Sequence, residues 1–224
     1  MKALIFDVDG TLAETEGLHL DAFNATFAAV GLPWAWSEAD YLRLLTTTGG
    51  KERIARHVRE TGGDPDALPV AEIHAEKTRR YAAMMAAGRI ALRPGVEVLL
   101  AEARAAGLKL AVATTTTPAN VDALMHATLG CGAAEVFDVV AAGDMVAAKK
   151  PAPDIYLLAL ERLGVAADAA LAFEDSRNGL EAARAAGLRV VVTPGRFTAG
   201  EDFTGADRVV DVLPALSELL APAR

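Results

Sequence analysis

The chain has 224 residues, of which 52% are hydrophobic and 23% are charged, and its formal net charge is −8 at pH 7. This composition is that of an ordinary globular protein, and the length allows one large domain or a core domain with a smaller companion. The acidic balance argues against nucleic acid as a partner, because proteins that bind nucleic acid usually present a basic surface. The single cysteine, Cys131, excludes an internal disulfide and fits a reducing compartment.

The apolar stretch near the N-terminus is too short for a signal peptide or a membrane span. It covers residues 3–6, and Asp7 ends it far short of the roughly 20 apolar residues that a transmembrane helix requires. No other segment has a targeting or membrane-spanning pattern. We therefore predict a cytoplasmic protein without a membrane partner.

Six short runs have strand character, and the first five are apolar throughout rather than alternating. Such runs are typical of parallel strands that are covered on both faces. The six runs are residues 3–7, 109–115, 138–142, 170–175, 189–193 and 207–211. Helix-like stretches rich in alanine and leucine lie between them, at residues 95–107, 120–130, 153–164 and 179–187. This alternation predicts an α/β fold, with a doubly wound parallel sheet and helices on both faces.

Residues 15–88 break the alternation of strands and helices. They contain helical stretches, such as residues 19–31 and 51–63, but no convincing strand. We predict that they form a small helical domain inserted after the first strand, while residues 1–14 and 89–224 form the core domain. The alternative is a set of extra helices packed on one side of the sheet.

Polar or charged residues follow four of the predicted strands. In open parallel sheets, ligands bind beyond the carboxyl ends of the strands, so these segments mark the predicted site. The four segments are residues 7–9, 113–117, 143–154 and 173–179.

Four carboxylates of this edge would repel one another unless a cation binds between them. They belong to Asp7, Asp9, Glu174 and Asp175. Two carboxylates about 5 Å apart repel by roughly 3 kcal/mol at an effective dielectric constant of about 20. A Mg²⁺ ion, which prefers oxygen ligands, removes this cost and leaves room for phosphate oxygens. The sequence therefore predicts a site for a metal and a phosphate.

The spacing of Asp7 and Asp9 suits two different chemical roles, one for each carboxyl group. Residues i and i+2 of a strand point the same way, which turns Val8 into the protein. One carboxyl can attack phosphorus while the other serves the leaving group, because neighbouring carboxyls push their titrations apart. Lys150 and the hydroxyl of Thr114 suit the phosphate oxygens, as a point charge and a donor.

Simpler structural roles exist for several of these residues. Lys150 is alternatively a surface lysine that flanks a helix, and Glu174 is alternatively a cap for the helix that begins near Ser176. Lys51 and Arg53 also have the spacing of an exposed helix face.

Four motifs together resemble those of the haloacid dehalogenase (HAD) superfamily. They are "DVDGT" (7–11), Thr114, the lysine of "KKPAPDIY" (149–156) and "EDSRNG" (174–179). The helical insert resembles the type-1 cap of the beta-phosphoglucomutase-like branch, and within it the phosphatases of xylulose-1,5-bisphosphate that are associated with the Calvin cycle. The resemblance spans essentially the whole chain. It implies a HAD-like Rossmannoid core, Mg²⁺ as the cofactor, a small sugar phosphate as the substrate, and a monomer.

The resemblance also implies roles for the acidic residues. Asp7 would be the nucleophile that becomes an aspartyl phosphate. Asp9 would protonate the leaving oxygen and then activate water. Mg²⁺ would bind the carboxylate of Asp7, the backbone carbonyl of Asp9 and Asp175, with Glu174 nearby.

The phosphoryl group and the rest of the substrate would contact residues of both domains. Thr114, the backbone of Thr115 and Lys150 would bind the transferring phosphoryl group, and Lys149 is a second candidate for that charge. Where a substrate carries phosphates at both ends, the cap grips the second one, and our candidates for this contact are Lys51, Arg53 and Lys77. The full set of predicted substrate contacts is Glu16, His19, Thr48, Gly49, Gly50, Lys51, Arg53, Lys77, Thr115 and Thr116.

Three functions fit these residues. The first is a Mg²⁺-dependent phosphatase of a small sugar phosphate, expected to be a ketopentose bisphosphate (xylulose-1,5-bisphosphate to xylulose 5-phosphate). The second is a phosphomutase of the beta-phosphoglucomutase type, in which the phosphoryl group passes to a sugar hydroxyl. The third is a phospho-accepting domain without enzymatic activity. We favour hydrolysis because the segment 46–54 is more similar to the bisphosphatases than to the mutases.

Overall fold

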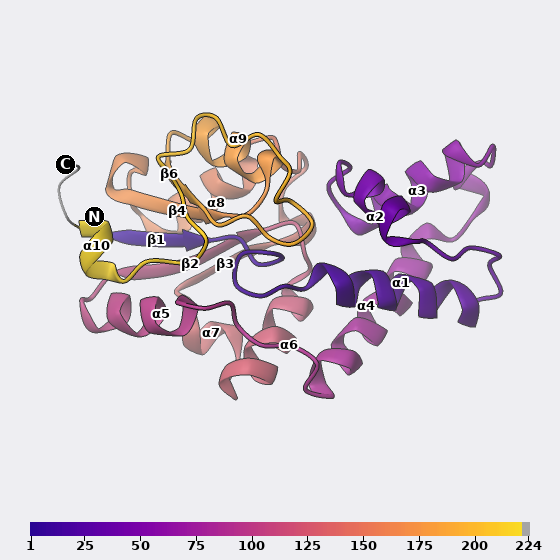
Figure 1. The fold of residues 1–224 in the computed structure, drawn as a ribbon, viewed down its shortest axis with the longest axis horizontal. Helices are drawn as coiled ribbons and strands as arrows, with labels where there is room; N and C mark the ends of the chain where they lie inside the picture. Colours follow the sequence, from indigo (N-terminus) through magenta and orange to yellow (C-terminus); the bar gives the residue numbers. More distant parts are fainter. Residues whose placement is uncertain (221–224) are drawn as a thin grey trace.

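A parallel β-sheet with helices on both faces forms the larger part of the molecule (Figure 1). The computed structural model describes residues 1–220. The strand order is β3-β2-β1-β4-β5-β6, and every neighbouring pair is parallel. The predicted α/β fold class is therefore confirmed. The strands are β1 (Ala3–Phe6), β2 (Lys109–Thr114), β3 (Val139–Ala142), β4 (Ala170–Glu174), β5 (Arg189–Val192) and β6 (Arg208–Val209).

Strands β1, β2, β4 and β5 each end one residue earlier than the sequence predicted, although the amide of Asp7 still donates to the carbonyl of Phe173 at 3.0 Å. In the register of the sheet, Phe6 lies opposite Val112 of β2 and Phe173 of β4. The carboxyl ends of three neighbouring strands therefore meet at one edge. The sixth predicted strand is reduced to two residues at the margin of the sheet.

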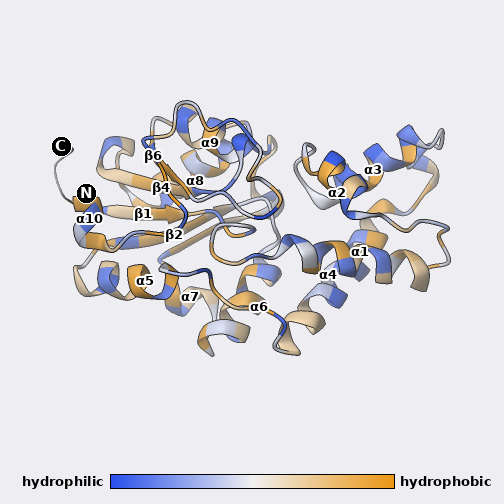
Figure 2. Ribbon diagram, in the orientation of Figure 1, coloured by the Kyte–Doolittle hydropathy of each residue, from blue (hydrophilic) through white to orange (hydrophobic). Residues whose placement is uncertain are grey.

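The two faces of the sheet are covered by separate apolar layers. Leu4 and Phe6 face one layer, while Ala3 and Ile5 face the other, as the period of two along a strand requires. Figure 2 shows hydrophobic residues along the strands between the helices. The first layer contains α5 (Val96–Ala105), α6 (Pro118–Leu129), α7 (Ala133–Val136) and α10 (Leu216–Leu220). The second layer contains α8 (Asp154–Leu163) and α9 (Arg177–Ala185).

Four helices between β1 and α5 form the part of the molecule beyond the carboxyl edge of the sheet (Figure 1). No residue from 15 to 88 lies in a strand. We propose that these residues form a cap domain, as the sequence analysis expected. The helices are α1 (Glu16–Ala29), α2 (Glu38–Leu45), α3 (Gly50–Glu60) and α4 (Val70–Ala86). None of the helices in residues 1–220 has the length and apolarity of a membrane span.

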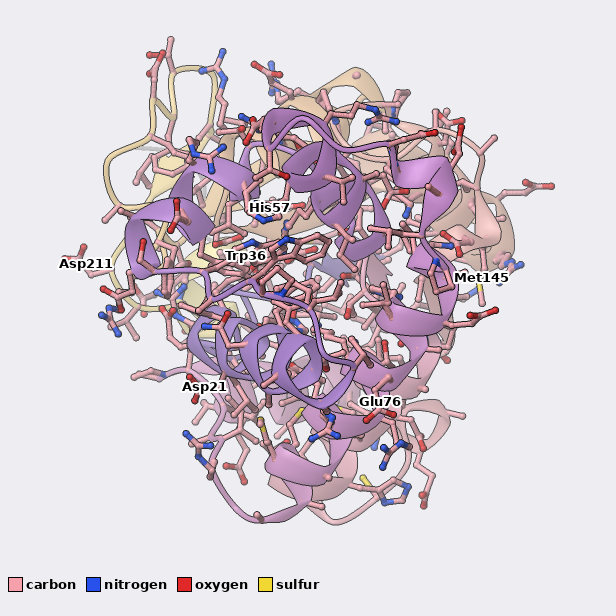
Figure 3. The ribbon with its side chains drawn as sticks, turned by 90° about the vertical axis from the view of Figure 1, so that its right-hand side faces the viewer. Asp21, Trp36, His57, Glu76, Met145 and Asp211 are labelled. Atoms are coloured by element: carbon pink, nitrogen blue, oxygen red, sulfur yellow. The ribbon has the colours of Figure 1, made fainter. Side chains whose placement is uncertain are left out.

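Aromatic side chains fill the interior of the cap. Phe23 and Phe27 pack on Trp36 with ring centroids 4.8 Å away in both cases. Figure 3 shows Trp36 and His57 near the middle of this end of the molecule. The cap also touches the core domain, because Tyr81 of α4 belongs to the same apolar cluster as the buried residues of α6.

The two linkers between cap and core are joined to each other. Ala13 and Leu92 form an antiparallel bridge, and the amide of Arg93 donates to the carbonyl of Leu12 at 2.8 Å. The guanidinium of Arg93 then donates to three backbone carbonyls, those of Gly10, Thr193 (2.7 Å) and Pro194 (2.9 Å). Arg93 therefore ties the second linker to the loops that follow β1 and β5.

We predict that Arg93→Met lowers the free energy of unfolding by about 3 kcal/mol, because it leaves backbone carbonyls without a donor. The matched control is Arg89→Met in the same linker. The side chain of Arg89 is 54% exposed, against 11% for Arg93, and its one ion pair joins it to Asp21. We expect the control to change stability by less than about 0.5 kcal/mol. Urea unfolding measures both variants, and equal losses would contradict the role of Arg93.

Candidate active site

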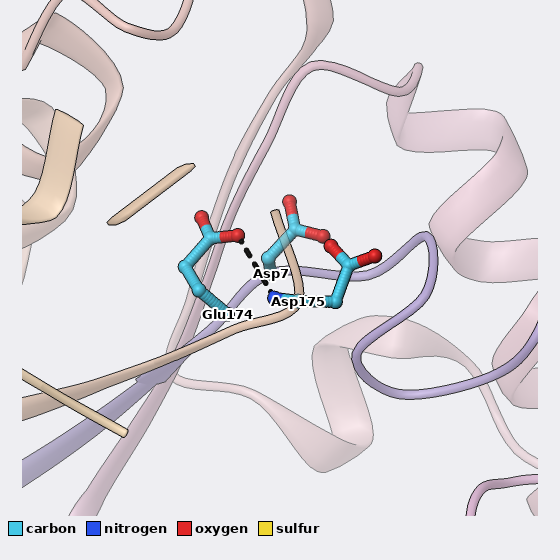
Figure 4. A group of neighbouring side chains, drawn as sticks. All are labelled: Asp7, Glu174 and Asp175. Atoms are coloured by element: carbon cyan, nitrogen blue, oxygen red, sulfur yellow. Dashed lines mark hydrogen bonds between the residues drawn. The ribbon is translucent and has the colours of Figure 1, made fainter. Parts of the chain in front are cut away.

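Three buried carboxylates meet at the carboxyl ends of β1 and β4 (Figure 4). Asp7 follows β1, Glu174 ends β4, and Asp175 is the next residue. An oxygen of each lies within 4.8 Å of an oxygen of the other two. All three are less than 10% exposed. The pairing of Phe6 with Phe173 brings them together, because it aligns the ends of the two strands.

Two glycines leave the room that these carboxylates occupy. A Cβ atom at Gly179 would lie 1.9 Å from Oε2 of Glu174, and a Cβ atom at Gly10 would lie 2.1 Å from Oδ2 of Asp175. Gly10 also has a φ of +88°, which favours glycine sterically. The acid cluster therefore depends on residues without side chains in two separate segments.

Lys150 lies beside the acid cluster and is itself buried. Its ammonium donates to Oδ1 of Asp7 at 2.6 Å and to Oε1 of Glu174 at 2.5 Å. The hydroxyl of Tyr156 donates to the same oxygen of Glu174. Lys149, the other predicted candidate, points instead toward the cap and pairs with Glu52 at 2.7 Å.

The acid cluster fits a hard divalent cation. Burial raises the pKa of Asp7 to about 8, with Glu174 and Asp9 adding to the shift against the opposing charge of Lys150. Burial, together with the charges of Asp7 and Glu174, also raises the pKa of Asp175 well above its usual value. A bound cation would offset these effects and favour the ionised carboxylates. The donor set consists only of oxygens, which suits Mg²⁺.

Asp9 has different neighbours from Asp7. Its Oδ1 accepts a hydrogen bond from Thr15 at 2.6 Å and lies 2.9 Å from Nε2 of His19. The ammonium of Lys77 donates to Nδ1 of His19, which leaves Nε2 to donate to Asp9. Burial favours the neutral form of Asp9, yet His19 and Thr15 outweigh it and hold the pKa of Asp9 below its usual range.

The two aspartates have different hydrogen-bond partners, although both line one pocket. Asp7 faces Lys150, whereas Asp9 faces the cap, so the side chain of Asp9 is outside the three-carboxylate cluster. The strand ends at Phe6, and the amide of Leu12 turns back to the carbonyl of Val8 at 2.9 Å. Asp9 therefore lies in a turn that follows the strand. Val8 is buried, as predicted.

Two adjoining pockets contain most of the predicted site residues, and they share Asp9, Arg53 and Thr115. The core pocket is lined by the shared residues and by Asp7, Glu16, Leu45, Thr48, Lys150, Asp175, Ser176, Asn178, Thr198 and Glu201. The cap pocket is lined by the shared residues and by His19, Phe23, Gly49, Gly50, Lys51, His74, Lys77, Thr116, Thr117, Asn120, Gly143, Asp144 and Lys149.

Thr114 and Glu174 are the two predicted site residues that line neither pocket. The hydroxyl of Thr114 is buried and accepts the amide of Thr116 at 3.2 Å, so it supports the turn after β2. Glu174 does not cap α9, because the side chain of Ser176 accepts the amide of Gly179 there. Glu174 is instead a member of the acid cluster that lines neither pocket.

The predicted cap residues form ion pairs around the pockets. Lys51 pairs with Asp144 at 2.6 Å, and Lys149 pairs with the same carboxylate at 3.2 Å. Arg53 donates to the hydroxyl of Tyr41 at 3.0 Å and lies 3.8 Å from the carboxylate of Glu16. The cations of the cap pocket are therefore balanced by acids from both domains.

Several pocket residues were not predicted from the sequence. Asp144 and Asn178 fall within the segments 143–154 and 173–179, which the strand-end rule had already marked. The amide of Asn178 donates to Thr48 of the cap at 3.3 Å. His74 lies in the middle of α4, where no motif distinguishes it from other helical residues.

The fold places an acid cluster at the carboxyl edge of a parallel sheet, and the comparisons identify the family of hydrolases to which it belongs. The model of the haloacid dehalogenase-like hydrolases matches residues 1–187. Protein CbbY of Cereibacter sphaeroides is 59% identical over 98% of this chain and 95% of that protein. The chain belongs to the haloacid dehalogenase-like hydrolases, as the motifs predicted, and it is a phosphatase of that family.

Two solved structures are similar to nearly the whole chain. Crystalline CbbY from Rhodobacter sphaeroides in complex with phosphate has a TM-score of 0.95 and is 59% identical, over 98% of this chain and 99% of that chain. A mutant of the same CbbY in complex with xylulose-(1,5)bisphosphate has a TM-score of 0.95 and is 58% identical, over the same shares of both chains.

We predict that Gly179→Ala weakens Mg²⁺ binding at least about tenfold, because the new methyl group displaces Glu174 and the site is sensitive to ligand position. The matched control is Gly17→Ala, at an early position of α1 where a Cβ atom meets nothing within 4 Å. Calorimetric titration with Mg²⁺ compares the two variants. Unchanged affinity in Gly179→Ala would show that Glu174 does not support the metal site.

Proposed function

We propose that this phosphatase hydrolyses a small sugar bisphosphate in the presence of Mg²⁺, with xylulose-1,5-bisphosphate as the expected substrate and xylulose 5-phosphate as the product. The pair of adjoining pockets is the observation that carries this proposal. One pocket contains the acids and Lys150, and the other contains Lys51, Lys77 and Lys149. Such a pair suits a substrate with one phosphate that reacts and another that is held. A mutant of the similar CbbY forms a complex with xylulose-(1,5)bisphosphate, which supports a bisphosphate as the substrate class.

Asp7 and Asp9 carry the bond changes in this proposal. The carboxylate of Asp7 attacks phosphorus and forms an aspartyl phosphate, while Asp9 gives a proton to the departing sugar oxygen. Asp9 then takes a proton from water, the water attacks phosphorus, and inorganic phosphate leaves Asp7 free. The lowered pKa of Asp9 keeps its carboxyl ionised, which is the form that the second, basic step requires. In the first step Asp9 gives up its proton and returns to this ionised form, which Thr15 and His19 stabilise.

Other residues would hold the transferring group and the cofactor. Lys150 and the backbone amide of Thr115 would bind the phosphoryl oxygens, and Lys150 takes precedence over Lys149 because it lies beside Asp7. The carboxylates of Asp7 and Asp175 and the carbonyl of Asp9 would hold Mg²⁺, supported by Glu174. The ion supplies charge neutralisation of the phosphoryl group when it is bound.

The cap would select the substrate and exclude water. Lys51, Arg53 and Lys77 would bind the second phosphate, while Glu16 and His19 would contact the sugar beside the hinge. Thr48, Gly49, Gly50 and Thr116 complete the proposed contacts. We further propose a cytoplasmic monomer that acts in the Calvin cycle, without nucleic-acid or membrane partners, on the basis of the composition and the resemblance alone.

A substrate screen tests the proposed function. The purified enzyme with Mg²⁺ is incubated with sugar monophosphates and bisphosphates, and both free phosphate and isomeric sugar phosphates are measured. We expect phosphate release with the highest kcat/KM for xylulose-1,5-bisphosphate. An isomeric sugar phosphate without free phosphate would establish the phosphomutase instead. A preference for monophosphates would refute the role of the cap pocket.

We predict that Asp7→Asn and Asp9→Asn each lower kcat at least about 10³-fold, because catalytic groups that act as a unit cannot replace one another. The matched control is Asp21→Asn, which removes an exposed aspartate of α1 and leaves kcat unchanged. Only Asp9→Asn should still accumulate phosphoenzyme, because it retains the nucleophile. A chelator should abolish turnover and added Mg²⁺ should restore it. Normal turnover in either variant would reject the assigned roles.

A further inference from the structure

Phe197 is a residue of the core domain whose side chain packs against the interior of the cap. It lies in the segment 193–207, which connects β5 to β6. Its half-buried ring meets the ring of Tyr41 edge-on, with centroids 5.9 Å apart and an interplanar angle of 85°. Among residues 1–220, it is the one hydrophobic residue from outside the cap that packs against the aromatic cluster of the cap. Phe197 therefore gives the cap a contact with the core domain that is separate from the two linkers.

The turn that carries Phe197 is fixed to the core domain beside the acid cluster. The hydroxyl of Thr198 donates to Oδ2 of Asp175 at 3.1 Å, and the amide of Gly195 donates to that hydroxyl at 2.8 Å. Gly195 is buried, and a Cβ atom there would lie 3.1 Å from the same carboxylate oxygen. The position of the Phe197 ring is consequently set by contacts within the core domain.

Two of the ion pairs between cap and core face water. Arg196 pairs with Glu38 at the start of α2, and these side chains are 67% and 55% exposed. Lys51 pairs with Asp144, and these side chains are 36% and 62% exposed. Such pairs contribute little, because water already solvates both charges. The contact of Phe197 removes apolar and aromatic surface from water, so we expect it to hold the cap more strongly than either ion pair.

Tyr41 connects this contact to the core pocket. Its hydroxyl donates to Oε2 of Glu16 at 2.5 Å and accepts a hydrogen bond from Nη1 of Arg53 at 3.0 Å. Glu16 and Arg53 line the core pocket, whereas Tyr41 and Phe197 line neither pocket. A displacement of the Tyr41 ring would therefore move two charged groups that line the pocket of the acid cluster.

We propose that Phe197 is a positioning residue of the phosphatase. It holds the cap against the core domain and fixes Tyr41, so that Glu16 and Arg53 are in place at the core pocket before the substrate binds. Without the ring, the cap would lie against the core in a smaller fraction of the molecules. The apparent affinity for a substrate that contacts both domains would fall by that fraction. This inference rests on the proposed function only for the substrate used in its kinetic test.

Steady-state kinetics of the full chain with Mg²⁺ test the inference. Phe197→Ala removes the ring, and Phe197→Leu keeps an apolar side chain. One matched control is Arg196→Gln, which removes the ion pair of the same turn. The other is Phe203→Ala, which removes an aromatic ring that packs on the apolar layer of α8 and α9. Xylulose-1,5-bisphosphate probes the contacts of both domains, whereas 4-nitrophenyl phosphate has one phosphate and probes the core pocket.

We expect Phe197→Ala to raise KM for the bisphosphate about tenfold and to change kcat less than about twofold, because bound substrate holds the cap in place at saturation. Phe197→Leu should raise KM about threefold, since it keeps part of the apolar contact. Both controls should match the parent, and all variants should hydrolyse 4-nitrophenyl phosphate equally well. An unchanged KM in Phe197→Ala, or an equal loss of kcat on both substrates, would overturn the inference.

Small-angle X-ray scattering without substrate gives a readout that depends on neither turnover nor the choice of substrate. We expect a larger radius of gyration in Phe197→Ala than in the parent and in Arg196→Gln, and the bisphosphate should remove the difference. Equal radii without substrate would overturn the inference. A larger radius in Phe197→Ala, with a parent that prefers monophosphates, would overturn the proposed substrate and support the inference. Should Phe197→Ala fail to fold, Phe197→Leu is expected to show the same changes at smaller size.

Discussion

Repulsion among three buried carboxylates is the constraint on which the site depends. At separations of about 5 Å and an effective dielectric constant of about 20, each pair costs roughly 3 kcal/mol when both members are ionised. The ammonium of Lys150 offsets part of this repulsion, because it donates to both Asp7 and Glu174. The three carboxylates also offer only oxygen ligands, which suit a divalent cation. The backbone at glycines 10 and 179 lies so close to the carboxylates that a Cβ atom at either position would collide with them. Lys150 and the two glycines therefore hold together three carboxylates that would otherwise separate or become protonated.

The cap pocket differs from the acid cluster, because several lysines and one arginine line it. Lysines of the cap pocket are restrained by Asp144, by Glu52 and by the contact of Lys77 with His19. Asp9 lines both pockets and accepts a hydrogen bond from the cap. The residue that we propose as acid and base therefore contacts the domain that would recognise the substrate. The two aspartates of this short segment therefore bond to different domains, Asp7 to the core and Asp9 to the cap. Burial raises the pKa of Asp7, whereas the charge and hydrogen bonds of His19 and Thr15 outweigh burial and lower the pKa of Asp9.

Many of the pocket residues could be predicted because ligands bind beyond the carboxyl ends of parallel strands, and the order of the strands along the chain marks those ends. Once strands are recognised, the residues after them share an edge, and segments 143–154 and 173–179 are marked before any contact is known. The rule does not give the partners of Asp9, which lies in a turn after the strand and bonds to residues of the cap. The predicted phosphate contact of Thr114 stays a prediction, and in the structure its hydroxyl accepts the amide of Thr116.

The sequence by itself determined the α/β class, the helical character of residues 15–88 and the polar segments that follow the strands, because periodicity, strand-end residues and local motifs are properties of short segments. Only the tertiary structure decided which partners each side chain meets. Lys150 instead of Lys149 beside Asp7, Asp9 turned to His19, and His74 facing the lysines all depend on contacts between residues far apart in the chain. Such contacts arise from the packing of α1, α3 and α4 over the edge of the sheet, and no local pattern encodes that packing.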